Sequence, residues 1–228
     1  MKKFFTPILF TILLPLTFSC STLRGYTLNE TDAANAIRQL LQIGARDGAY
    51  SFNKETIMTS LFPEDVRKVL NTLQQLGLTN EIDRFSNTLS TAAEQTATKS
   101  IPIFVDGISR INFSDAIRII KNGGTSATDY LRSSTGPELR RSITPVMQSA
   151  LDEYKLVEQW NKIIKPVKGI AGNKFNLDLT TLMAGVVSEA MFRKIEEKER
   201  EIRANAAART TPLLQKVFSR NWNDIAGN

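Results

Sequence analysis

Three carboxylates stand in sequence surroundings that suit acid–base chemistry. Glu94 lies among small residues in an alanine-rich segment, Glu189 lies inside the apolar stretch AGVVSEAMF, and Asp115 stands at the start of a short apolar-periodic segment. A partly buried carboxylate has a raised pKa that favours proton donation, and two facing carboxylates can hydrolyse a glycosidic bond. A periplasmic hydrolase that uses Glu94 with Asp115 or Glu189 is therefore one hypothesis.

Structural roles explain the same carboxylates more simply. Glu94 can bind a neighbouring arginine or a backbone amide, and Asp115 can stabilise the positive end of a helix dipole. Nothing in the sequence shows that any two of the three meet. We therefore assign no catalytic residue and keep Glu94, Asp115 and Glu189 as weak candidates.

The absence of histidine and the single cysteine, Cys20, exclude several kinds of site. Ser-His-Asp and Cys-His catalysis cannot occur within this chain. A tetrahedral zinc site would need histidine or several cysteines, and an internal disulfide would need a second cysteine. Ser51 and Lys54 fit the S-x-x-K pattern of serine acyl-enzymes, but the accompanying S-D-N and K-T-G elements are missing. We expect no metal and no cofactor.

A basic segment between residues 155 and 174 is a candidate membrane or partner contact. It carries five lysines and one glutamate with a tryptophan between them. A basic amphipathic segment of this kind can rest on anionic lipid head groups. A solvated lysine face over a core-facing tryptophan is the simpler interpretation. The residues that would make the contact are Lys155, Trp160, Lys162, Lys165 and Lys168.

The N-terminus is typical of a signal peptide that ends at Cys20. Two lysines precede an apolar run, from Phe4 to Leu16, that is too short to span a membrane. Cys20 directly after Ser19 resembles the lipobox of bacterial lipoproteins, in which the signal peptide is cut before the cysteine and the cysteine thiol is diacylglycerated. Ordinary signal peptidase cleavage, which would leave a free thiol, is the alternative. Acyl chains would hold the protein on a membrane, and Ser21 after the cysteine resembles the pattern of lipoproteins sent to the outer membrane.

The mature chain has helical periodicity. We expect helices over residues 80–100, ended by Pro102, over 114–121, over 180–205 and in the segment TTPLLQKVF. Thr135 and Glu138 have capping-box spacing and predict another helix start. No useful two-residue alternation occurs, which predicts an all-α bundle of roughly eight to ten helices in a single domain. The clearest apolar faces comprise Ala33, Ile37, Leu40, Leu41 and Gly44, and then Val66, Val69, Leu70, Leu73 and Leu76.

The pair Gly123-Gly124 separates two predicted helices. At least one of these glycines is expected to adopt a left-handed backbone conformation, and Thr125 is expected to cap the helix that follows. Near the end of the chain, Glu196 with Arg200 and Glu199 with Arg203 have the spacing of ion pairs on one helix face.

Five sequence blocks, taken in order, resemble those of a known family. They are IRQLLQIGARDGA, LFPEDVRKVLNTLQQLG, AAEQTATKSIPIFVDGI, FSDAIRIIKNGGTSATDYLR and EEKEREIRANAAARTTPLLQKVF. Together they resemble domain-of-unknown-function family 4197, a set of bacterial envelope proteins, over about residues 31 to 219. The resemblance implies an exported helical domain with no assigned reaction.

These observations predict a bacterial envelope lipoprotein. Residues 1–19 would be the signal peptide, 20–30 the lipidated N-terminus and tether, 31–219 the helical domain and 220–228 a C-terminal tail.

The net charge of +6 falls to +4 without the signal peptide, which is too mild to indicate nucleic-acid binding. A non-catalytic binding or scaffolding domain is the leading hypothesis, with a hydrolase or a carrier of an apolar ligand as alternatives. The expected partners are the membrane, through the anchor, and an envelope protein or apolar ligand.

Overall fold

The computed structural model describes residues 27–50, 64–171 and 178–223. Within these residues the chain forms eight α-helices and one 3-10 turn and contains no strand, which confirms the all-α prediction. The helices are α1 (Glu30–Tyr50), α3 (Glu64–Gln75), α4 (Thr79–Arg110), α5 (Ala116–Asn122), α6 (Ser126–Glu153), α7 (Leu156–Ala171), α8 (Leu179–Ala204) and α9 (Pro212–Phe218), with the 3-10 turn η2 (Ala206–Ala208) before α9.

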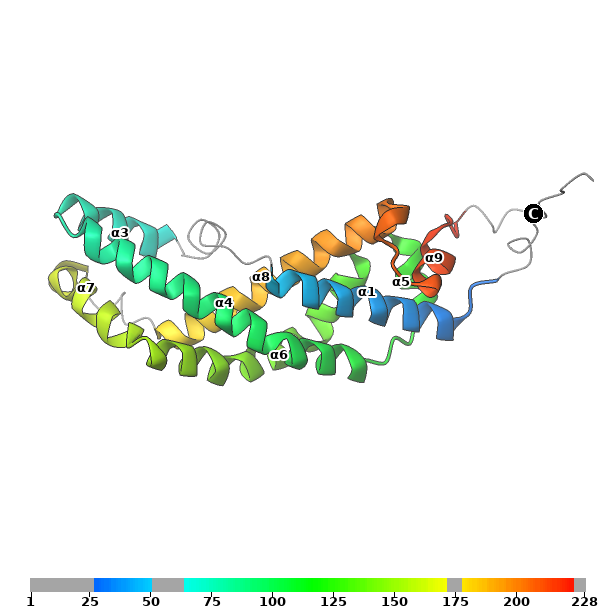
Figure 1. Cartoon of the computed structure of the whole chain (residues 1–228), viewed down its shortest axis with the longest axis horizontal. Coiled ribbons are helices and arrows are strands. Elements are labelled where there is room, and N and C mark those ends of the chain that lie inside the picture. Colours follow the sequence, from blue (N-terminus) through cyan, green and yellow to red (C-terminus); the bar gives the residue numbers. More distant parts are fainter. Residues whose placement is uncertain (1–26, 51–63, 172–177, 224–228) are drawn as a thin grey trace, which may run out of the picture.

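Four long helices form a closed ring that contains most of the core. The most extensive contacts run from α1 to α8, from α8 to α6, from α6 to α4 and from α4 back to α1. The short helices cover the two ends of this elongated bundle: α3 and α7 lie at one end, and α5 and α9 lie at the other (Figure 1). None of the described helices combines the length and the apolar character needed to cross a bilayer.

Helix α1 and helix α8 approach each other closely through two glycines. A Cβ atom at Gly44 would lie 3.1 Å from the Cα of Ile195, and one at Gly48 would lie 2.7 Å from the Cβ of Lys194. Residues four positions apart lie on one face of a helix, so Gly44 and Gly48 leave one strip of α1 without side chains. The predicted apolar face from Ala33 to Gly44 packs in the core.

Two helix boundaries predicted near prolines were wrong, because the helices and their buried residues continue past Pro102 and Pro137. The helix expected to end before Pro102 runs on to Arg110, and Phe104, Gly107 and Ile108 are buried beyond the proline. Likewise, the helix start predicted at Thr135 does not exist, because α6 continues through Pro137. The hydroxyl of Thr135 instead donates to the carbonyl of Leu131 at 2.9 Å. Proline removes one backbone donor, and the buried apolar face on both sides outweighs that loss.

The second predicted apolar face is correct at Leu73 and wrong at Leu76. Leu73 is fully buried, whereas Leu76 is 62% exposed at the last turn before Gly77. The other residues of that face lie outside the described side chains. The predicted ion pairs on α8 and the capped helix α9 are confirmed, with the Thr211 hydroxyl accepting from the Leu214 amide at 3.2 Å.

The turn between α5 and α6 depends on both glycines. Gly123 has φ 68° and Gly124 has φ 56°, so both adopt the backbone conformations that favour glycine. A Cβ atom at either position would meet no neighbour within 4 Å. The requirement is therefore one of backbone geometry and does not come from packing.

Replacing Gly123 or Gly124 with alanine should lower the free energy of unfolding by about 1 kcal/mol or more, because alanine is strained at positive φ. Gly136→Ala is the matched control. Its Cβ would meet only ordinary contacts at 3.8 Å and beyond, and alanine favours the helix interior. Urea denaturation measures both effects. Unchanged stability in Gly123→Ala and Gly124→Ala would show that the turn tolerates another geometry.

Candidate functional site

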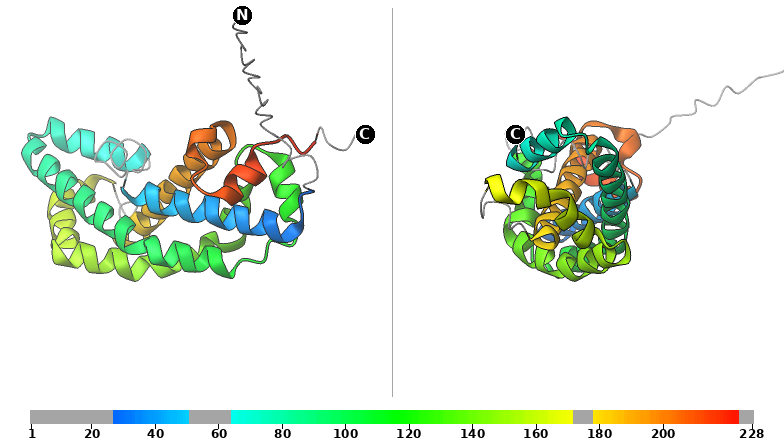
Figure 2. Two further views of the ribbon diagram at one scale, coloured as in Figure 1. Left: turned by 45° about the vertical axis from the view of Figure 1, so that its right-hand side comes forward. Right: turned by 90° about the vertical axis from the view of Figure 1, so that its left-hand side faces the viewer.

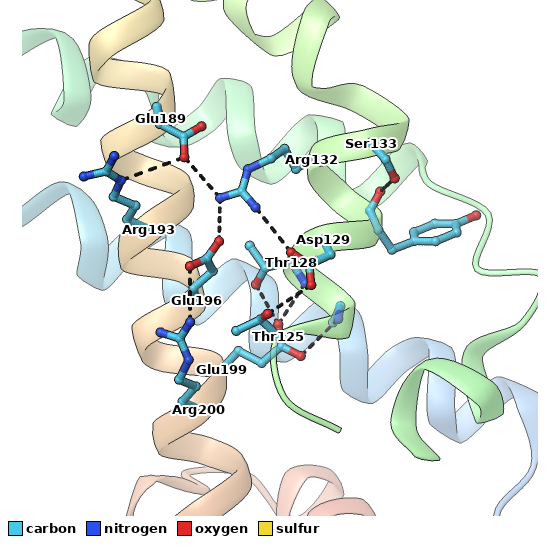
Figure 3. A network of polar contacts seen from close by, with 12 residues as sticks. Thr125, Thr128, Asp129, Arg132, Ser133, Glu189, Arg193, Glu196, Glu199 and Arg200 are labelled. Atoms are coloured by element: carbon cyan, nitrogen blue, oxygen red, sulfur yellow. Dashed lines mark hydrogen bonds and ion pairs between the residues drawn. The ribbon is translucent and has the colours of Figure 1, made fainter. Parts of the chain in front are cut away.

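A fully buried carboxylate, that of Glu199, joins α8 to the start of α6. Its side chain is 0% exposed. One carboxylate oxygen accepts from the Ala127 amide at 3.0 Å, and the other accepts from the amide and hydroxyl of Thr128 at 2.8 and 2.6 Å (Figure 3). The first amides of a helix have no partner within the helix. Glu199 therefore supplies the N-terminal cap of α6 from another helix.

This arrangement replaces the cap predicted at Thr125. Thr125 occupies the N-cap position, but its side chain makes no capping hydrogen bond to the backbone. Its hydroxyl donates to Asp129 at 3.0 Å instead. The positive end of the α6 dipole thus faces the Glu199 carboxylate.

Arg203 completes the same cluster at the C-terminus of α5, which is the negative end of that helix dipole. Its guanidinium lies 2.9 Å from the Glu199 carboxylate. It also donates to the carbonyls of Ile120 and Ile119 at 3.1 and 3.3 Å, in the last turn of α5. The Ser126 hydroxyl accepts from it at 3.2 Å. One buried ion pair therefore satisfies the C-terminus of α5 and the N-terminus of α6 together.

A second, more exposed charge cluster surrounds Arg132 between α6 and α8. Its guanidinium lies 2.6 Å from Glu196, 3.4 Å from Glu189 and 3.3 Å from Asp129 (Figure 3). It also lies over the ring of Phe192, with the guanidinium carbon 5.1 Å from the centroid. Burial lowers the pKa of Arg132, but the hydrogen bond to Glu196 and the three acidic charges outweigh it and raise that pKa. Arg132 is therefore a permanent cation that holds the two helices together.

A cavity with a volume of about 260 Å³ lies between α4 and α6. Ile103 and Leu139 form part of its apolar wall, and Ser134 and Ser142 contribute hydroxyls. Glu138 and Arg110 also line the cavity, and their side chains lie 3.5 Å apart. Polar and apolar groups converge here, as they do in binding sites.

The structure does not bring the predicted carboxylates together in any described contact. Glu94 is exposed on α4. Asp115 precedes α5, where it pairs with Arg118 at 2.7 Å and makes no capping hydrogen bond. Glu189 belongs to the Arg132 cluster. None of the three lines the α4–α6 cavity.

The predicted lysine contact lies on α7 and just before it. Trp160 is buried and stacks on Phe85 with ring centroids 5.6 Å apart. Lys155, Lys162 and Lys165 are exposed, which agrees with a solvated face over a core tryptophan. Lys168 lies outside the described side chains, and Cys20 and the Ser51 to Lys54 motif lie outside the described residues.

The importance of Glu199 was missed in the sequence, although its pairing with Arg203 was predicted. In EEKEREIR it is one of several alternating charges, and such a run is typical of a solvated face. Only the packing of α8 against the α5–α6 turn distinguishes it from Glu196 or Glu197. Among the described residues, no group of three or more potential metal ligands occurs.

Over its described residues the protein is an all-α bundle in which a buried ion pair joins the end of α5 to the start of α6. Residues 27–219 match the family described as Protein of unknown function (DUF4197). Because the match covers most of the chain, the protein belongs to this family, as the sequence blocks predicted. Searches of curated proteins and of solved structures found no significant match.

Removing the Glu199 carboxylate should strongly destabilise the bundle. In Glu199→Ala, Arg203 and the amides at the start of α6 would remain buried without their partner, at a cost of about 3 to 5 kcal/mol. Glu197→Ala is the control, because Glu197 is exposed and its pair with Lys194 contributes about 1 kcal/mol or less. Chemical denaturation measures the difference, and hydrogen exchange should show lost protection at Ala127 and Thr128. Equal costs for the two variants would contradict the capping role.

Proposed function

We propose that this protein is a bacterial envelope lipoprotein, anchored through Cys20, whose helical domain binds a partner without catalysing a reaction. The α4–α6 cavity is the observation that supports binding most directly. It lies between two long helices of the ring, and its walls combine apolar side chains with hydroxyls and an ion pair. A partner can therefore be recognised by shape and hydrogen bonding together.

The cavity size favours a protein partner over a large free ligand. Pockets for drug-sized ligands have volumes of about 300 to 1,000 Å³, whereas this one has about 260 Å³. A cavity of that size suits one large side chain, and interfaces commonly use a single aromatic or arginine anchor in such a pocket. We infer that an envelope protein inserts an anchor side chain between α4 and α6.

Filling this cavity should abolish partner binding. Ser142 is an exposed residue of α6 that lines the cavity, so Ser142→Trp should occupy it and leave the core intact. Ser149→Trp is the matched control, because it changes an exposed serine on the same helix that does not line the cavity. Quantitative co-purification from native membranes compares the two. Identical sets of partners for both variants and the wild type would reject the cavity as the binding site.

The anchor is tested separately at Cys20. Intact-mass analysis of the mature protein from its native host should show a chain that begins at Cys20 and carries acyl chains. Cys20→Ser should give a released protein or an uncleaved precursor, with the melting behaviour of the helical domain unchanged. A mature chain that begins after Cys20, or one with an unmodified thiol, would refute the lipoprotein assignment.

A further inference from the structure

The α4–α6 cavity holds two neutral polar side chains that lie close together and have no hydrogen-bond partner. The hydroxyl of Ser134 and the amide of Asn112 line it, and neither bonds to another residue in the described part of the chain. Tyr130, one helical turn before Ser134, donates its hydroxyl to the Asn112 carbonyl at 3.1 Å. Ser134 and Asn112 are both exposed, so they can bind a group that enters from solvent.

An apolar wall lies next to these two polar groups and is fixed by packing. Ile103 and Leu139 form part of this wall. A Cβ atom at Gly107 would lie 3.0 Å from the Cδ2 of Leu139, so the missing side chain lets Leu139 lie against α4. The ring of Tyr130 packs on that of Phe113, with centroids 5.5 Å apart. The cavity is therefore largely preorganised, which lowers the cost of binding.

The charged residues of the wall already have ionic partners. Arg110 lies 2.8 Å from Asp106 and 3.5 Å from Glu138. The cavity lies in the later part of α4 and the first half of α6, towards the α5–α9 end, whereas the lysine face of α7 lies at the other end (Figures 1 and 2). A charged side chain that entered the cavity would have to break an existing pair or lose water without a partner. The cavity therefore favours a neutral occupant.

Tyrosine fits these features best among the side chains that commonly anchor interfaces. Such anchors are enriched in tryptophan, tyrosine and arginine. Arginine is a permanent cation and finds no unpaired carboxylate among the lining residues. The indole of tryptophan can only donate a hydrogen bond, whereas a phenol both donates and accepts. A phenol can therefore bind Ser134 and Asn112 while its ring packs on the apolar wall.

We propose that the α4–α6 cavity binds the phenol side chain of a tyrosine on an envelope protein. This inference rests on the proposed function, because it names the side chain that the partner inserts. The ring lies against Ile103 and Leu139, and the hydroxyl exchanges hydrogen bonds with Ser134 and Asn112. Ser134 and Asn112 are then the residues that determine specificity, and the apolar wall supplies contact area.

Side-chain analogues test the choice of tyrosine on the full protein. The protein from native membranes is titrated with p-cresol, toluene, methylindole and propylguanidinium, and the NMR shifts of the Gly107 and Ser134 amides report binding. We expect p-cresol to bind on the order of fivefold more tightly than toluene, because a hydrogen bond contributes about 1 kcal/mol. No binding of p-cresol, or equal or tighter binding of any other analogue, would overturn the proposal.

Polar variants test whether the two neutral groups produce this preference. Ser134→Ala and Asn112→Ala should each reduce the preference for p-cresol over toluene and leave toluene binding unchanged, because the apolar wall is intact. Ser149→Ala is the matched control, since it removes an exposed hydroxyl of α6 that does not line the cavity. A full preference for p-cresol in both cavity variants would contradict the proposed hydrogen bonds.

Co-purification separates failure of this inference from failure of the proposed function. Ser134→Ala should weaken capture of the partner that Ser142→Trp abolishes, and replacing the inserted tyrosine of that partner with phenylalanine should have the same effect. Loss of the partner in Ser142→Trp without any preference for p-cresol defeats this inference alone. A preference for p-cresol, with unchanged partners in Ser142→Trp, instead defeats the proposed function and leaves only a phenol-selective cavity.

Discussion

The buried pair of Glu199 and Arg203 is the interaction on which the arrangement of the helices depends. Removing two charges from water costs several kcal/mol per ion, and only good geometry with further hydrogen bonds offsets that cost. Here the Glu199 carboxylate accepts hydrogen bonds from the amides at the start of α6, and the Arg203 guanidinium donates to the carbonyls at the end of α5. The pair therefore stabilises one position of α8 relative to the Gly123-Gly124 turn.

Around this pair, the charges of the bundle divide into structural and surface groups. Arg132 joins α6 to α8 at a partly exposed contact between the two helices. Its three acidic partners give it a structural role in the packing of these helices. The cavity between α4 and α6 lies outside this cluster, since neither Arg132 nor its acidic partners line it.

The errors in the helix boundaries predicted from the sequence share one physical origin. Pro102, Pro137 and the Thr135 capping pattern each favour a local break in a helix, yet α4 and α6 run through them. A proline costs a few kcal/mol locally, whereas buried residues such as Phe104 and Leu139 contribute about 1.5 to 3 kcal/mol each. Local signals therefore predicted the number of helices well and their lengths poorly. In the same way, Leu76 continues the apolar pattern of α3 but is exposed where that helix ends.

Sequence patterns alone predict the helical class, the family, the Gly123-Gly124 turn and the two ion pairs on α8, because spacing along one helix and glycine geometry are local properties. The sequence also excludes histidine chemistry, since no histidine is present. The burial of Glu199 and the exposure of Glu197 follow from tertiary packing, as do the different contacts of Asp115 and Glu189. Packing also brings Glu199 to the start of α6 and Arg203 to the end of α5. These contacts join residues 71 to 84 positions apart, and they arise from the packing of whole helices, which no local pattern encodes.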